Sequence, residues 1–199
     1  MRLIVSELAC ERGGRVLFSG MSFTVESGEA ALLTGPNGAG KTSLLSILAG
    51  LLKPLSGAAR LEDEGEEIEL SEEAHLIGHR DGLKSQLLVS ENLSFSQALL
   101  GSPSLSSKAA LATLELEHVL HLPCAYLSAG QRRRVALARL LVARRPLWLL
   151  DEPTAALDSA SRAVLTKLMG DHLAAGGLIV AATHEPLGIG AAEIRIGGV

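Results

Sequence analysis

The stretch Ala30–Ser43, AALLTGPNGAGKTS, decides the fold of this 199-residue chain. Its first five residues, Ala30–Thr34, form a mostly apolar run typical of a strand, and a helical pattern follows Gly40. Between them the residues fit the pattern G-x-x-x-x-G-K-[ST], in the strand–loop–helix context that this motif requires. Glycines let backbone N–H groups surround an anion, and the helix N-terminus adds partial positive charge. The stretch therefore predicts a phosphate-binding loop in an α/β fold.

This loop supplies the candidate residues for binding a nucleoside triphosphate. Lys41 is expected to reach the β- and γ-phosphates, and the Thr42 hydroxyl to ligate Mg²⁺. The alternative is a glycine-rich turn that matches by chance, which is expected in under about one per cent of shuffled sequences of this composition. We expect the following residues to hold ATP: Gly35, Pro36, Asn37, Gly38, Ala39, Gly40, Lys41, Thr42 and Ser43.

A second apolar segment, Leu147–Leu150, ends in two adjacent carboxylates. At the end of a buried strand beside a phosphate loop, Asp151 is expected to hold Mg²⁺, and Glu152 to polarise the attacking water. The alternative is an acidic pair at a helix N-terminus, which Pro153 would favour. Because the phosphate loop lies upstream, we interpret the pair as catalytic.

A third motif, LSAGQ at Leu127–Gln131, opens an arginine-rich helix. Small residues at a helix N-terminus predict a second anion-binding site, with a plain helix cap as the alternative. The expected contacts come from Ser128, Ala129, Gly130 and Gln131. One nucleotide cannot occupy two such sites on distant loops of one small domain. A head-to-tail dimer resolves this, with Ser128 of one subunit facing the γ-phosphate that Lys41 of the other subunit holds.

Strand and helix patterns alternate on both flanks of the chain, and the middle third is helical. We expect one domain over 1–199, with an α/β core at 1–89 and 123–199 and a helical lobe at 90–122. The runs Leu147–Leu150 and Leu178–Thr183 are continuously apolar, as in strands of a parallel sheet covered on both faces. Shorter β-type runs at Leu3–Leu8 and Met21–Val25, and a helix at Ser107–Val119, complete the main expectations.

Composition excludes several classes of protein. The five aromatic residues are too few for a protein that stacks single-stranded nucleic acid bases, and no nucleic-acid partner is expected. Eight acidic residues and no Lys or Arg lie in Glu62–Glu73, which predicts a solvated surface loop; without them the net charge of −4 becomes +4. Cys10 and Cys124 show no disulfide or zinc spacing, and no apolar run approaches the length of a membrane span.

The order of the motifs resembles the ATP-binding subunits of ABC transporters over essentially the whole chain. In that family, Gly35–Thr42 corresponds to Walker A, Leu127–Gln131 to the signature motif, Leu147–Glu152 to Walker B, Ala155–Asp158 to the D-loop and His184 to the switch histidine. The resemblance implies a P-loop core of the ABC ATPase type, with an inserted helical lobe and an N-terminal antiparallel β part. It also implies that His184 contacts the γ-phosphate, that Glu152 activates water and that Asp158 couples the two sites.

Two positions depart from the family pattern. The glutamine that usually links Mg²⁺ to the membrane domain falls at His79 or Arg80, and Gln86 lies too far along to replace it. The adenine-stacking aromatic falls near Arg12, whose guanidinium plane is able to stack on a base. Both contacts are therefore in question.

Within the family, the chain is similar to the haem-exporter ATP-binding subunits of cytochrome c maturation. The segments Cys10–Gly20, Leu76–Lys84 and Leu127–Val135, and a tail of 15 residues after His184, carry this resemblance. It implies ATP and Mg²⁺ as ligands, an integral membrane permease subunit as partner, and an ATP-dependent homodimer within an A2B2-type complex. It further implies a peripheral position on the cytoplasmic face of the inner membrane, with haem handled by partner proteins.

Three other functions fit parts of the pattern. An ABC ATPase that exports a lipid, drug or peptide would have the same motor residues. A soluble ABC protein of DNA repair or translation would usually carry tandem cassettes or long coiled-coil insertions, which this sequence lacks. A small P-loop kinase would lack the motif at Leu127–Gln131 and would phosphorylate an acceptor.

Overall fold

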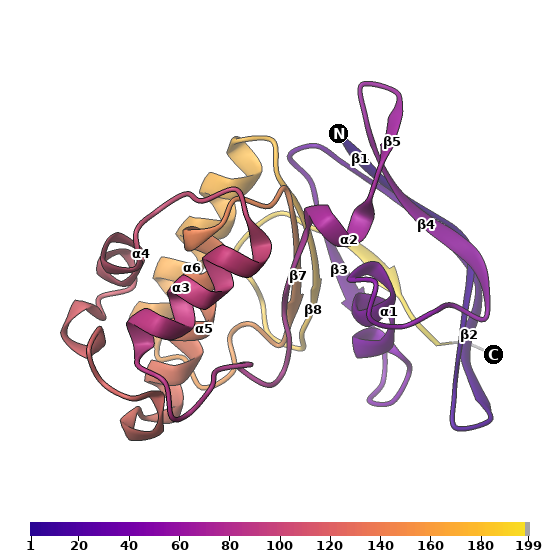
Figure 1. The fold of residues 1–199 in the computed structure, drawn as a ribbon. Helices are drawn as coiled ribbons and strands as arrows, with labels where there is room; N and C mark the ends of the chain where they lie inside the picture. Colours follow the sequence, from indigo (N-terminus) through magenta and orange to yellow (C-terminus); the bar gives the residue numbers. More distant parts are fainter. Residues whose placement is uncertain (198–199) are drawn as a thin grey trace. The chain divides into compact units, whose positions relative to one another are not determined.

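The computed structural model describes residues 1–197 (Figure 1). They form two compact units, each assembled from segments that are separate in the sequence. The first unit contains Met1–Gly78, Pro146–Pro153 and the described part of Met169–Val199, and the second contains His79–Arg145 and Thr154–Leu168. The helical lobe predicted at 90–122 lies within the second unit.

An antiparallel sheet of the first unit begins at the N-terminus of the chain, with strand order β2-β1-β4-β5. Its strands are β1 (Arg2–Arg12), β2 (Arg15–Glu26), β4 (Ser56–Asp63) and β5 (Glu66–Ile68). Alternate side chains of β1, such as Leu3 and Val5, are buried, as expected when one face of a strand covers a core. The predicted N-terminal antiparallel β part is confirmed, and β1 and β2 extend beyond their apolar runs.

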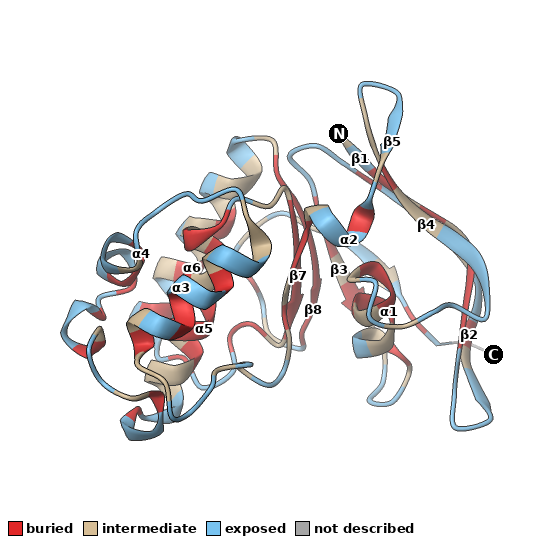
Figure 2. Ribbon diagram, in the orientation of Figure 1, coloured by how far each residue is buried: buried red, intermediate tan, exposed pale blue. Residues whose placement is uncertain are grey.

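A five-stranded parallel sheet of the same unit has the order β6-β7-β8-β3-β9. Its strands are β3 (Ala30–Thr34), β6 (Ala74–Ile77), β7 (Leu147–Asp151), β8 (Leu178–Ala182) and β9 (Ala192–Arg195). Figure 2 shows β7 and β8 buried along their whole length, which explains their continuous apolar sequences. Helix α1 (Lys41–Leu48) packs against both strands through Leu44, Leu45 and Leu48.

The register of this sheet brings the candidate motifs to one edge. Ala182 at the end of β8 pairs with Leu33 of β3 on one side and with Asp151 of β7 on the other. Because all three strands run in the same direction, the segments that follow them start side by side. These segments are the glycine-rich loop, Glu152 and the residues from Thr183 onward.

The acidic stretch Glu62–Glu73 is not the surface loop that its charge predicted. It contains the end of β4, the strand β5 and the short helix α2 (Leu70–Glu73). A turn at Glu64, with φ of 51°, joins the two strands, and Leu70 is anchored in the core. The error arose because most of the glutamates between Glu64 and Glu72 are exposed while the backbone of the stretch pairs with its neighbour. Hydrogen bonds from Arg60, and then from Arg2, lower the pKa of Glu62 at the base of this hairpin.

Helices make up the second unit. They are α3 (Val89–Leu100), α4 (Ser107–Thr113), α5 (Ala129–Val142) and α6 (Ser159–Ala174), with 3₁₀ turns η1 (Glu117–Val119) and η2 (Cys124–Tyr126); α6 continues into the first unit. Helices α3 and α5 contact each other, and both carry buried residues (Figure 2). The expected helix at Ser107–Val119 ends early, because Glu115 adopts a left-handed conformation with φ of 56°.

Membrane-spanning segments are absent from the helices of residues 1–197, none of which combines the length and the apolar character needed to cross a bilayer. The same residues contain no group of three His, Cys, Asp or Glu side chains suited to a metal ion. Cys10 and Cys124 are free thiols, and burial raises the pKa of each.

Candidate functional site

The glycine-rich loop joins β3 to α1 and depends on its glycines. Gly35, Gly38 and Gly40 have φ values of 136°, 80° and 109°, which side chains rarely tolerate. A Cβ atom on Gly35 would lie 2.2 Å from the carbonyl oxygen of Ile196, and one on Gly40 would lie 2.9 Å from the ring of Phe18. The loop therefore requires glycine both for its backbone angles and for its close packing.

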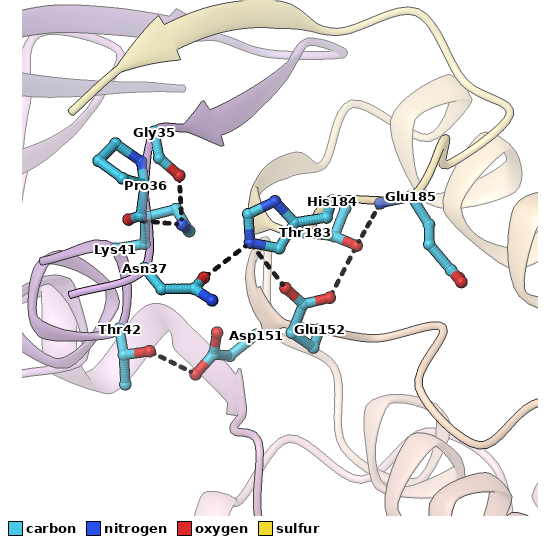
Figure 3. A network of polar contacts seen from close by, with 10 residues as sticks. All are labelled: Gly35, Pro36, Asn37, Lys41, Thr42, Asp151, Glu152, Thr183, His184 and Glu185. Carbon is cyan, nitrogen blue, oxygen red and sulfur yellow. Dashed lines mark hydrogen bonds and ion pairs between the residues drawn. The ribbon is translucent and has the colours of Figure 1, made fainter. Parts of the chain in front are cut away.

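Lys41 lies folded over this loop (Figure 3). Its Nζ atom donates hydrogen bonds to the carbonyl oxygens of Gly35, at 2.7 Å, and of Pro36, at 3.2 Å. Within residues 1–197, no side chain caps the N-terminus of α1, which begins at Lys41. The ammonium group and the first N–H groups of the helix thus converge at one place, an arrangement that suits an anionic group such as phosphate.

Thr42 and Asp151 meet across 109 positions of sequence. The Thr42 hydroxyl donates a hydrogen bond of 2.9 Å to Oδ2 of Asp151. Asp151 is the last residue of β7, and only 5% of its surface is exposed. A hydroxyl and a carboxylate oxygen are hard donors of the kind that Mg²⁺ takes, together with water and phosphate oxygens. These two residues therefore fit a magnesium ion bound with a nucleotide.

Glu152 adopts an unusual backbone conformation directly after Asp151. Its φ of 47° lies in the left-handed region, where a residue other than glycine carries strain. Its N–H group donates a 2.7 Å hydrogen bond to the carbonyl oxygen of Ala182, and Oε2 of its carboxylate accepts a 2.9 Å hydrogen bond from the Thr183 hydroxyl. Strain held by such contacts is typical of functional positions.

His184 faces the same carboxylate from the segment after β8 (Figure 3). Its Nε2 atom lies 3.1 Å from Oδ1 of Asn37 and 4.0 Å from Oε1 of Glu152. The side chain is 57% exposed, so the imidazole is accessible to a ligand placed between the glycine-rich loop and Glu152.

The LSAGQ motif forms the N-terminus of α5 in the second unit. The Ser128 hydroxyl accepts a 3.2 Å hydrogen bond from the N–H group of Gln131, and the Gln131 side chain accepts one of 2.9 Å from the N–H group of Ser128. The sequence allowed either an anion-binding site or a plain helix cap at this position. The reciprocal hydrogen bonds show that the cap is formed. Ser128 and Ala129 are nevertheless exposed, so that the helix N-terminus faces solvent.

Asp158 lies in the same unit and caps α6. Its Oδ1 atom accepts a 2.8 Å hydrogen bond from the N–H group of Ser161. Hydrogen bonds from Ser161, and secondarily the charge of Arg134, lower the pKa of Asp158. The carbonyl oxygen of Ala156 closely approaches Gly130, where an added Cβ would lie 3.0 Å from it. The Asp158 segment and the LSAGQ motif therefore adjoin each other.

The structure thus places the candidate residues in two groups, one in each unit. The first unit brings together Lys41, Thr42, Asp151, Glu152 and His184. The second unit holds Ser128, Ala129, Gly130, Gln131 and Asp158. The roles assigned to these residues stay predictions. Thr183 is a residue that the sequence reasoning missed, and its only signal was a polar side chain at the end of a buried strand beside His184.

The segment where the family glutamine was sought contains an unexpected ion pair. Asp81 follows His79 and Arg80, and its Oδ1 atom lies 3.4 Å from Nη1 of Arg133 on α5. Nη1 of Arg139, also on α5, donates a 3.3 Å hydrogen bond to the Asp81 carbonyl oxygen. Asp81 therefore fastens this loop to the helix that starts with the LSAGQ motif.

Comparison with known proteins gives consistent matches over most or all of the chain. A family model described as ABC transporter matches residues 18–155. The cytochrome c biogenesis ATP-binding export protein CcmA of Nitrobacter winogradskyi is 58% identical over 198 residues, covering 100% of this chain and 99% of the relative. The protein of the same name from Bradyrhizobium diazoefficiens is 55% identical and covers 100% of both chains.

Solved structures show the same fold. An ABC transporter ATP-binding protein of Pyrococcus furiosus superposes with a TM-score of 0.82 at 24% identity, covering 98% of each chain. The ATP-binding cassette MJ0796, a dimer bound to ADP and phosphate, matches with a TM-score of 0.77 at 24% identity, covering 92% of this chain and 88% of that one. The predicted fold class is therefore confirmed.

Proposed function

Because this chain belongs to the ATP-binding subunits of ABC transporters, and among them to the cytochrome c biogenesis export proteins, we propose that it is the ATP-hydrolysing subunit of a haem exporter. The observation that carries the proposal is the contact between Thr42 and Asp151, with Glu152 and His184 beside it. It joins a phosphate-binding loop to a metal-binding carboxylate and to a second carboxylate able to accept a proton.

The proposed reaction is hydrolysis of ATP. The glycine-rich loop and Lys41 bind the phosphates, while Thr42 and Asp151 would hold Mg²⁺, which would supply positive charge to the phosphates. Glu152 accepts a proton from a water molecule, whose oxygen then forms a bond to the γ-phosphorus. The bond between that phosphorus and the β–γ bridging oxygen breaks, giving ADP and phosphate. His184, whose Nε2 atom lies 4.0 Å from Oε1 of Glu152, would contact the γ-phosphate.

The second group of residues acts on the nucleotide of another subunit in this proposal. Ser128 to Gln131 of one copy would face the γ-phosphate bound by Lys41 of a second copy, in an ATP-dependent homodimer. The exposed, positively polarised N-terminus of α5 supports such a contact. Asp158, which adjoins the motif, would couple the two sites. The Ser128 Oγ accepts the capping hydrogen bond from Gln131, so its own proton remains available to donate to a phosphate oxygen.

Two copies would assemble with two integral membrane permease subunits in an A2B2-type complex. The chain would then lie peripherally on the cytoplasmic face of the inner membrane, and partner proteins would handle the haem. Dimer closure would be passed to the permease near His79–Asn92, which Asp81 fastens to α5. This makes the chain an ABC-type haem translocase ATPase with ATP and Mg²⁺ as its ligands.

Recovery of the tagged chain from native membranes in a mild detergent tests the transport assignment. We expect a small polytopic subunit and proteins of cytochrome c maturation to co-purify, with haem absorbance in the complex. Co-purification with an unrelated permease would agree with the role as a transporter ATPase and contradict the assignment to haem export. Recovery without any membrane protein would contradict transport itself.

A further inference from the structure

The Thr183 hydroxyl has two hydrogen-bonding neighbours that together fix its direction (Figure 3). Its Oγ1 atom lies 2.9 Å from Oε2 of Glu152 and 3.1 Å from the backbone nitrogen of Glu185. A backbone N–H group is only a donor, so Oγ1 accepts the hydrogen bond from Glu185. The single hydroxyl proton therefore points at Glu152. Thr183 is 4% exposed, so water competes little for this proton.

Glu152 is consequently held at two points by the end of β8. Its main chain donates to the carbonyl oxygen of Ala182, and its side chain accepts from the next residue, Thr183. Two bonds to consecutive residues restrict both the backbone and the carboxylate plane. They also distinguish the two carboxylate oxygens, because Oε2 accepts from Thr183 while Oε1 lies on the His184 side, 4.0 Å from Nε2.

We propose that Thr183 is a positioning residue that orients the Glu152 carboxylate so that Oε1 takes the proton of the attacking water. This inference rests on the proposed ATP hydrolysis and adds a residue outside the ATP-binding motifs. A general base must be aimed at the proton that it removes, and a small misplacement costs roughly 100-fold in rate. Because the Thr183 hydroxyl donates its hydrogen bond to Glu152, its removal should affect the chemical step more than ATP binding.

A purely structural role for the same hydroxyl is the rival explanation. By accepting from the Glu185 N–H group, Oγ1 also closes a local turn after β8. Thr183→Val keeps the shape of the side chain and removes both hydrogen bonds, whereas Thr183→Ser keeps both. A double-mutant cycle with Glu152→Gln separates the two roles, because only the positioning role depends on the Glu152 carboxylate.

The experiment measures Mg-ATP hydrolysis by the full chain in its detergent-solubilised membrane complex. We expect Thr183→Val to lower kcat by roughly 10- to 100-fold with KM changed by less than about threefold, and Thr183→Ser to stay within about threefold of the parent. In the Glu152→Gln background, Thr183→Val should cause no further loss. Melting temperature and elution volume of each variant show that it is folded and assembled, and Thr183→Ala, which also removes the hydroxyl, carries the test if the valine variant is not.

Each contrary result overturns a defined part of the account. Unchanged kcat in folded Thr183→Val, a loss in Thr183→Ser as large as that in the valine variant, or a further loss in the Glu152→Gln background would each refute the positioning role. A wild-type rate in Glu152→Gln alone would instead refute the assignment of Glu152 in the proposed function, and the role of Thr183 with it. Failure of the positioning role is therefore seen in the Thr183 variants, and failure of the proposed function in Glu152→Gln alone.

Discussion

Replacing Gly35 by alanine tests whether the described geometry of the phosphate loop is correct. The new Cβ would lie 2.2 Å from the carbonyl oxygen of Ile196, at a φ of 136°. Ile196 also donates a 2.8 Å hydrogen bond to the carbonyl oxygen of Thr34, so moving its backbone away weakens the contact beside β3. Backbone strain of about 1–3 kcal/mol and overpacking of about 1–3 kcal/mol give a loss of about 4 kcal/mol.

Gly38→Ala is the matched control in the same loop. Gly38 has a φ of 80°, but an added Cβ would meet no described atom within 4 Å. Only the left-handed backbone is penalised, at about 1.5 kcal/mol. At about 3 °C of Tm per kcal/mol for a chain of this size, we expect Gly38→Ala to lower Tm by about 4–5 °C and Gly35→Ala by about 12 °C.

The assay is thermal and urea unfolding of both variants without nucleotide, so that lost ligand binding does not contribute. A similar decrease for the two variants would mean that Ile196 does not press on Gly35, and would refute the steric argument. A larger decrease for Gly38→Ala would contradict the description of the whole loop.

Three further predictions concern other parts of the chain. Lys41→Ala should weaken ATP binding by roughly 10- to 100-fold, because a charged donor to phosphate is lost; isothermal calorimetry that gives an unchanged Kd would contradict the phosphate-loop assignment. His172, which stacks on Trp148 at a centroid distance of 3.9 Å, has a pKa lowered by burial, so the unfolded chain protonates first and the free energy of unfolding should fall as pH drops below about 6.5. His172→Gln should flatten this pH dependence in urea titrations, and an unaltered slope would assign it to other groups. Asn92→Ala should cost about 1–3 kcal/mol, because the buried amide exchanges hydrogen bonds of 2.8 and 3.1 Å with the backbone of Lys84; a Tm within 1 °C of the parent would exclude that role.

Much of the first unit could be predicted because its motifs stand at strand ends. Continuous apolar runs identified β7 and β8, and parallel strands bring their carboxyl ends to one edge. Asp151 and Thr42 are 109 residues apart in the sequence. Their proximity in space followed from this rule and from the phosphate-binding motif. The buried residues of β7 and β8 produce the apolar runs in the sequence, and the same residues form the centre of the parallel sheet.

Other elements lacked such a signal. Strand β5 consists largely of exposed glutamates, and β6 has four residues, so neither shows a long apolar pattern. Helix α4 was predicted too long because the spacing of apolar residues does not reveal that Glu115 adopts a left-handed φ. Thr183 was missed for a related reason: its hydrogen bond to the Glu152 carboxylate depends on the pairing of β7 with β8, which a single apolar run does not reveal.

The family glutamine is expected at His79 or Arg80, and the structure describes the loop that contains this position. The loop that contains them is fastened to α5 through Asp81 and Arg133.

The most direct test of the central claim, shared hydrolysis sites in an ATP-bound dimer, is the elution volume of Glu152→Gln with saturating Mg-ATP. The account predicts a dimer with ATP and a monomer with ADP, because the variant binds ATP but lacks the carboxylate that accepts the proton from water. Lys41→Ala in the same background should remain monomeric, since its phosphate contacts are lost. A Glu152→Gln protein that binds ATP and still elutes as a monomer would contradict the shared-site mechanism.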